Sequence, residues 1–124
     1  MDVEDRKLIE ETVQLYFDGL YYGDVEKLKL AFHPAATVAG YFKGTPNLVP
    51  LEAFLKRVAE RQSPKEAGEA YDMRIASIDT KGQVGFVKVE DLYVGLRFTD
   101  YLALYKVDGK WRIISKGYYH EPAS

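Results

Sequence analysis

Apolar residues recur with the period of an α-helix through the first half of the chain. The segment from Val3 to Tyr22 predicts a long helix whose buried stripe consists of Ile9, Val13, Tyr16, Phe17 and Leu20. Gly23 ends this helix, and Asp24 suits the N-cap of a short second helix. The second helix is expected to close at His33-Pro34, because the residue before a proline disfavours helical geometry.

A third helix is predicted after a short strand and a loop. Residues 37–42 favour a β-strand, and the loop that follows is indicated by Gly44, Pro46 and Pro50. Helical spacing then returns in four apolar residues, Leu51, Phe54, Leu55 and Val58, and this helix ends near Arg61. The polar stretch at residues 63–68 is expected to form a surface loop.

From Tyr71 onward the apolar period changes to that of β-strands. Alternation begins at residues 71–75, and a turn is indicated at residues 79–82. Long strands are predicted at residues 83–93, 96–107 and 111–119, with a hairpin turn at Asp108-Gly109. Three helices ahead of these strands predict one α+β domain over residues 1–124, with the helices on one face of a strongly curved mixed or antiparallel sheet. Such a sheet around the long helix forms a cone with a pocket in its mouth.

Large side chains stand on both predicted faces of the last two strands. In residues 96–107 one face holds Phe98, Asp100, Leu102 and Leu104, and the other holds Thr99, Tyr101, Ala103, Tyr105 and Val107. In residues 111–119 one face holds Trp111, Ile113 and Tyr119, and the other holds Arg112, Ile114, Lys116 and Tyr118. Helices and pocket cover only one face, so we predict a homodimer through the other. The alternative is a tyrosine-rich face that stays in water.

Composition narrows the classes of protein and of site. The 124 residues include no cysteine, which excludes disulfides, thiolate chemistry and cysteine-bound metals. Only two histidines are present, His33 and His120, and we predict neither a metal site nor a cofactor. A formal net charge of −2 argues against a nucleic-acid partner. The acidic N-terminus and the lack of an apolar run of about 20 residues predict a cytoplasmic protein without a membrane partner.

Charged pairs and clusters along the chain point to solvated surfaces. Glu90 and Asp91 alternate to opposite faces of their strand, so they cannot share a metal ion. The basic residues gather weakly in two groups, which are expected on solvated faces: Lys27, Lys29 and Lys43, and then Lys56, Arg57 and Arg61. Ten tyrosines are a high number for this length, and tyrosine suits interfaces and ligand pockets.

Three segments resemble a known superfamily. They are FHPAATV at residues 32–38, TDYLAL at residues 99–104 and DGKWRIISK at residues 108–116. Together with the order helix, short helix, strand, helix and four long strands, they resemble the NTF2-like (cystatin-like α+β) superfamily. The branch that they resemble most is that of putative lumazine-binding proteins, and SnoaL-like proteins are more distant. The resemblance covers nearly the whole chain, and it implies the cone, a small-molecule ligand and a homodimer.

Δ5-3-Ketosteroid isomerase, a relative in this superfamily, bears on whether the chain is an enzyme. In that enzyme a tyrosine and a neutral aspartic acid donate hydrogen bonds to the enolate oxygen. Tyr16 falls on that tyrosine, and Asp100 falls close to that aspartic acid. The isomerase base, however, falls on Gly40, which cannot take a proton. The resemblance therefore implies a pocket with two hydrogen-bond donors and no positioned base.

Asp100, Tyr16 and His33 are the candidate catalytic residues, and each has a structural alternative. Asp100 shares a face with apolar side chains, so it either orients a ligand or bonds to a neighbouring side chain or to loop backbone. Tyr16 either contacts the ligand or is a core aromatic with a satisfied hydroxyl. His33 is either a general base at the pocket mouth or a histidine at a helix C-terminus. His120 is expected at the surface or an interface.

The primary hypothesis is a protein that binds a small, flat, partly apolar ligand in the cone. The candidate ligand-binding residues are Tyr16, Leu20, Phe32, Val38, Tyr41, Phe54, Val58, Phe98, Asp100 and Leu102. One alternative is an isomerase-type or dehydratase-type enzyme that uses Asp100 or His33 as acid or base. Another is an assembly module whose dimer face is its function. A titrating carboxyl beside an open cavity would favour the enzyme, and a sealed apolar pocket would favour binding.

Overall fold

Three helices and six strands make up the computed structural model, which describes residues 1–122. Their order is α1 (Val3–Tyr22), α2 (Val25–Ala31), β1 (Phe32–Phe42), β2 (Thr45–Pro50), α3 (Leu51–Glu60), β3 (Met73–Lys81), β4 (Val84–Tyr93), β5 (Leu96–Val107) and β6 (Lys110–Glu121). The predicted α+β class is confirmed. Within residues 1–122, no helix has the length and apolar character that crossing a membrane requires.

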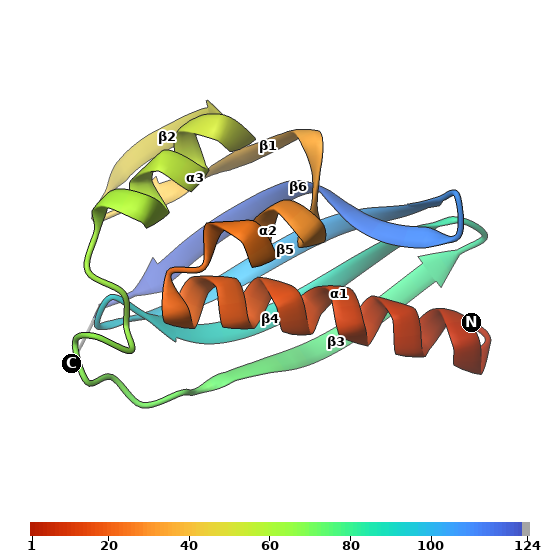
Figure 1. Cartoon of the computed structure of the whole chain (residues 1–124), viewed down its shortest axis with the longest axis horizontal. Coiled ribbons are helices and arrows are strands. Elements are labelled where there is room, and N and C mark those ends of the chain that lie inside the picture. The colour runs from red at the N-terminus through yellow and green to blue at the C-terminus, as the bar shows by residue number, and fades with distance from the viewer. Residues whose placement is uncertain (123–124) are drawn as a thin grey trace.

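The six strands form one curved, mixed sheet in the order β2-β1-β6-β5-β4-β3. Only β1 and β6 run parallel, and every other neighbouring pair is antiparallel. Figure 1 shows α1 crossing the long strands, with α3 beside β1 and β2. The core lies between the helices and the concave face, which we call the inner face of the sheet.

Helix ends follow the predicted caps except at the end of α2. The Asp24 side chain accepts a hydrogen bond from the Lys27 N–H at 3.2 Å and caps α2, and Gly23 ends α1 with a φ of 66°. The predicted end of the second helix at His33-Pro34 is wrong, because α2 stops at Ala31 and the extended residue Phe32 opens β1. The proline restricts the backbone before it, and the extended conformation begins one residue earlier still.

Strand β2 replaces the loop that the prolines predicted. Residues Thr45–Pro50 pair antiparallel with β1, and Pro46 and Pro50 lie opposite Tyr41 and Thr37. A proline cannot donate to a sheet, yet β2 is an edge strand with one free side, where that loss is tolerated. The prediction of a loop was therefore wrong, since it treated proline as a strand breaker at every position.

A β-bulge in β6 changes which side chains face inward. Leu104 pairs with Ile113, but Ala103 pairs with Ser115, so Ile114 is the additional residue in β6. Beyond this bulge the alternation is reversed. Lys116 is 7% exposed and lies on the inner face, whereas Tyr119 is 62% exposed on the outer face. The predicted grouping of Tyr119 with Trp111 and Ile113, and of Lys116 with Arg112 and Ile114, is therefore wrong.

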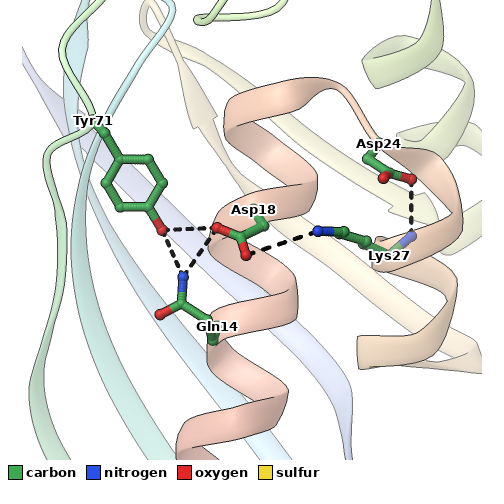
Figure 2. A network of polar contacts seen from close by, with 5 residues as sticks. All are labelled: Gln14, Asp18, Asp24, Lys27 and Tyr71. Atoms are coloured by element: carbon green, nitrogen blue, oxygen red, sulfur yellow. Dashed lines mark hydrogen bonds and ion pairs between the residues drawn. The ribbon is translucent and has the colours of Figure 1, made fainter.

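A polar network fastens the segment before β3 to α1 (Figure 2). Gln14 donates to Asp18 Oδ1 at 3.0 Å and to the Tyr71 hydroxyl at 2.9 Å, and that hydroxyl donates to Asp18 Oδ1 at 3.1 Å. Lys27 Nζ lies 4.0 Å from Asp18 Oδ2 and so joins α2 to the network. Burial and the nearby Asp18 carboxylate raise the pKa of Tyr71 to about 12, so its hydroxyl remains a donor at neutral pH.

Candidate functional site

A cavity of about 190 Å³ opens on the inner face of the sheet, beside α3. Strands β1, β2, β4, β5 and β6 also contribute to its wall. The wall is mostly aromatic and apolar, with a few charged groups: Val38, Phe42, Asn47, Phe54, Arg57, Arg61, Asp91, Tyr93, Phe98, Lys116 and Tyr118. Such a lining, apolar with few polar groups, is typical of small-molecule sites.

Tyr16 and Asp100 form a buried hydrogen bond at the centre of the fold. The Tyr16 hydroxyl donates to Asp100 Oδ2 at 2.6 Å, and the two residues are 0% and 1% exposed. Burial, together with the negative charge of Asp100, raises the pKa of Tyr16 well above its ordinary value. The phenol therefore stays protonated and donates at any physiological pH. Neither residue lines the cavity.

Asp91 connects this buried bond to the cavity. Asp91 and Asp100 lie on the same face of neighbouring strands, since Asp91 pairs with Phe98 and Asp100 pairs with Val89. Asp91 lines the cavity and is 2% exposed. Burial, and then the charge and close contact of Asp100, raise the pKa of Asp91 well above its ordinary value, and Lys116 opposes this effect.

The two carboxyl groups, which we call the carboxyl pair, lack donors for two of their oxygens. Asp91 Oδ2 and Asp100 Oδ1 are buried without a hydrogen-bond partner in the described chain. Ionised carboxylates can only accept hydrogen bonds, so two of them in contact repel each other. A proton on Asp91 supplies a hydrogen-bond donor between the two carboxyl groups, which agrees with the raised pKa of Asp91.

Lys116 brings an ammonium group into the cavity wall through a cage of aromatic rings. Its Nζ lies 4.5 Å from the centroid of Phe54, 5.2 Å from that of Tyr16 and 5.4 Å from that of Tyr118. Cation–π contacts of this kind are worth more where water is excluded, and Lys116 is 7% exposed. The charge of Lys116 is thus held close to Asp91 and open to the cavity.

Two arginines extend the charged part of the wall toward solvent. Arg57 is exposed and Arg61 is half-buried, and both project from the C-terminal end of α3. The Arg61 guanidinium carbon lies 5.5 Å from the Tyr93 ring centroid and 6.0 Å from that of Phe42. Burial raises the pKa of Tyr93, although the adjacent guanidinium of Arg61 lowers it. Arg57 is exposed, as expected of a solvated helix face, and it also lines the cavity, whereas Arg61 is half-buried and lies one residue beyond the end of α3.

The structure distributes the predicted site residues over four environments. Val38, Phe54 and Phe98 line the cavity, and Tyr16 and Asp100 lie next to it as a bonded pair. Four others are buried in the core without lining the cavity: Leu20, Phe32, Val58 and Leu102. Tyr41 is 49% exposed and lines a different, more open depression of about 620 Å³ beside Tyr119.

Neither histidine lines the cavity, although the His120 ring lies 5.1 Å from the ring of Phe98 in the wall. His33 is in β1, where its Nδ1 accepts a hydrogen bond from the Ala35 N–H at 3.0 Å and its ring lies 5.8 Å from that of Tyr105. His120 accepts from the Lys43 N–H through Nε2 at 2.8 Å. Neither ring lines the cavity, so acid–base work by His33 there lacks a geometric basis.

Eight of the wall residues were missed; the uncharged ones are Phe42, Asn47, Tyr93 and Tyr118, and of the three charged groups two left a signal in the sequence. Asp91 continues the alternation of Val87 and Val89, which places it on the inner face. Arg57 and Arg61 follow Phe54 at helical spacing, at the edge of the buried stripe. Lys116 left no such signal, because the bulge that turns it inward has no clear mark in the sequence.

Comparisons with known proteins agree with this fold. The profile of the family described as putative lumazine-binding matches residues 4–119. Aldolase FrzH from Cladobotryum sp is 30% identical over 115 residues, which are 90% of this chain and 87% of that protein. A crystal structure of an NTF2-like protein of unknown function from Shewanella baltica OS155 has a TM-score of 0.87 at 29% identity and covers 98% of both chains. Another, from Methylobacillus flagellatus KT, has a TM-score of 0.84 at 28% identity and covers 98% of this chain and 96% of that one.

Proposed function

The chain belongs to the putative lumazine-binding family of the NTF2-like superfamily, and on this premise we propose that its cavity binds a small, partly apolar carbonyl compound with which Asp91 exchanges a proton. The observation that carries the proposal is the position of Asp91, a buried carboxyl with a raised pKa in the wall of a cavity. Carboxyl groups with raised pKa values in clefts are typical of general acids and bases.

The surrounding groups suit proton removal from a carbon next to a carbonyl. The ionised Asp91 carboxylate takes the proton, and the electron pair of the C–H bond moves to the carbonyl oxygen to form an enolate. The Lys116 ammonium, in the same wall, stabilises that negative charge. The carboxyl proton of Asp91 then exchanges with solvent, and transfer of a solvent-derived proton from Asp91 to the enolate carbon regenerates the carbonyl compound. Asp100 and Tyr16 do not line the cavity and are positioning residues: Asp100 contacts Asp91, and Tyr16 donates a hydrogen bond to Asp100.

The curated relative named an aldolase supports the same chemical class. An aldol addition begins with proton removal next to a carbonyl, and the resulting enolate carbon then bonds to a second carbonyl carbon. A chain that performs the first step therefore shares its acid–base requirement with an aldolase. At 30% identity the likeness supports this class and does not name a substrate.

Hydrogen–deuterium exchange into a neutral ketone tests the proposal. We expect the protein to accelerate deuterium uptake by 2-tetralone in D2O, followed by proton NMR. The acceleration should fall at least about 100-fold in Asp91→Asn, which keeps the shape of the side chain and removes its basicity. The control is Asp79→Asn, on the exposed part of β3. The proposal would be contradicted if Asp91→Asn accelerated deuterium uptake as much as the wild type does. It would also be contradicted if the folded protein accelerated deuterium uptake by none of the three ketones 2-tetralone, cyclohexanone and acetophenone.

Binding without turnover is the second candidate, and the backbone at position 40 favours it. Gly40 stands where the isomerase has its base, and a Cβ there would collide with the carbonyl and ring of Tyr118. No larger residue fits at this point, so β1 cannot supply a base from position 40. Binding of 2-tetralone by titration calorimetry, without deuterium uptake, would assign the protein to this candidate.

We also propose that the chain forms a homodimer through the outer face of the sheet. Phe86 and Tyr101, 50% and 43% exposed, stack there with ring centroids 6.0 Å apart, and Ile114 and Tyr119 are exposed as well. Light scattering should give twice the mass of the chain for the wild type and the mass of one chain for Phe86→Ser/Tyr101→Ser. A monomeric wild type would contradict the proposal and, with it, the alternative of an assembly module that works through this face.

A further inference from the structure

The charged side chains in the cavity wall do not balance. Arg57, Arg61 and Lys116 are positive, and Asp91 is the only carboxyl residue among the lining residues. Burial and Asp100 raise the pKa of Asp91, which reduces the negative charge that it carries. The chain as a whole has a formal net charge of −2, so the excess of positive charge is a local property of this cavity.

The two arginines have no carboxylate partner of their own. The ion pairs formed among residues 1–122 involve other side chains, and neither Arg57 nor Arg61 takes part in one. Lys56, on the same helix, is exposed and does not line the cavity. A guanidinium presents its donors in a planar fork that matches the two oxygens of a carboxylate. The cavity thus offers anion-binding groups that the protein itself leaves unused.

Arg61 has a restricted position as well as a charge. Its guanidinium lies against the rings of Phe42 and Tyr93, which also belong to the cavity wall. Stacking against rings limits the rotamers of a long side chain, so less conformational entropy is lost when it binds an anion. Arg57, which is more exposed and without such contacts, contributes a weaker and more screened attraction.

We propose that the ligand is an oxo acid with an aromatic or apolar body, whose carboxylate pairs with Arg61 and Arg57 while its carbonyl faces Asp91 and Lys116. The carbonyl half rests on the proposed function, and the carboxylate half rests on the arginines alone. The apolar body packs against Phe54 and the other rings of the wall. One cavity thereby selects a molecule with a charged end and a reactive end.

Calorimetric titration with a matched pair of probes tests this inference. The probes are 4-phenyl-2-oxobutanoate and its methyl ester, which differ in the negative charge. We expect the acid to bind at least about tenfold more tightly than the ester, and this preference should shrink at high ionic strength. Arg61→Gln should weaken binding of the acid about tenfold and Arg57→Gln about threefold, with little effect on the ester. Lys56→Gln is the matched control and should leave both affinities unchanged.

The outcomes separate this inference from the proposed function. Equal affinities for acid and ester, no binding of the acid by the folded protein, or unchanged affinities in Arg57→Gln and Arg61→Gln would each overturn it. Deuterium uptake by the neutral 2-tetralone does not depend on the arginines and reports on proton transfer by Asp91 and the groups that assist it. A protein that exchanges 2-tetralone but does not prefer the acid keeps its proposed function and loses the oxo-acid ligand. Tight, arginine-dependent binding of the acid without any exchange supports the anion site and contradicts proton transfer.

Discussion

The inner and outer faces of the sheet each depart at a few positions from the usual pattern of apolar side chains inside and polar side chains outside. The inner face carries ionisable side chains at positions that are almost closed to water, with Asp91, Asp100 and Lys116 at 2%, 1% and 7% exposure. The outer face carries aromatic rings in water, with Phe86 and Tyr119 at 50% and 62% exposure. Buried charges and exposed aromatic groups are the two deviations that carry information, since apolar burial is the rule.

The difference teaches that, on the same strands, the residues that stabilise the fold are not the residues proposed to act on a ligand. Burying ionisable groups costs free energy unless partners offset it, and two oxygens of the carboxyl pair lack such partners. Leu102, next to Asp100 on the inner face of β5 and opposite Lys116 of β6, belongs to the buried apolar cluster that offsets the cost. The charged groups therefore cost the fold stability, which is the pattern that the proposed ligand site requires.

The largest expected effect is a difference in unfolding free energy between variants of two adjacent residues of β5. Leu102 is 0% exposed on the inner face, and Tyr101 is 43% exposed on the outer face. Leu102→Ala should lower the free energy of unfolding by about 3 kcal/mol, because it leaves a cavity in the core. Tyr101→Ala should lower it by less than about 1 kcal/mol when both proteins are measured at a concentration where light scattering finds them monomeric. Urea denaturation of both variants checks this, and similar losses would show that the outer face is also part of the core.

The next effect concerns the bond between Tyr16 and Asp100. Tyr16→Phe keeps the ring in the core but removes the donor to Asp100 Oδ2, so a buried carboxyl oxygen loses its partner. We expect a loss of about 1–3 kcal/mol in the free energy of unfolding. The control is Tyr22→Phe, on the same helix but 52% exposed, which should change little. Equal stability of wild type and Tyr16→Phe would mean that Asp100 finds another donor.

The sequence predicted the elements better than the faces that they present. The long helix, the third helix and the long strands follow from apolar period and caps, because each signal lies within a few residues. The bulge at Ile114 depends on how β6 pairs with β5, which is a contact between distant segments. A shift of one residue there moves Lys116 to the inner face and Tyr119 to the outer face.

The candidate site was predicted in part, since Val38, Phe54 and Phe98 line the cavity as expected. Tyr16 and Asp100 were identified through a resemblance, and the structure brings them into contact. The cavity wall depends also on Asp91 and on the arginines of α3, whose positions follow from how the helix packs beside β1 and β2. Edge strand β2 was itself missed, so the side of the cavity that it closes had no basis in the sequence reading.

The smallest expected effect is a dependence of stability on pH that has opposite signs for two aspartates. The pKa of Asp91 is raised in the folded chain by burial and by Asp100, so its proton stabilises the native state. That contribution is complete below the ordinary aspartate pKa of about 3.9 and is lost as pH rises through the raised value. Relative to Asp91→Asn, the wild type should therefore lose stability with increasing pH, by no more than about 1.4 kcal/mol per pH unit.

Asp5, outside the inner face, provides the comparison with the opposite sign. Hydrogen bonds from Lys106 and Trp111 lower the pKa of Asp5, so its contribution is present above the ordinary aspartate pKa and is lost as pH falls through the lowered value. Relative to Asp5→Asn, the wild type should thus lose stability only in acid. Urea denaturation of the three proteins from pH 3 to pH 8 measures both trends. If the two aspartates gave the same sign, Asp91 would be an ordinary paired carboxylate, and the inner face would have no group poised for proton transfer.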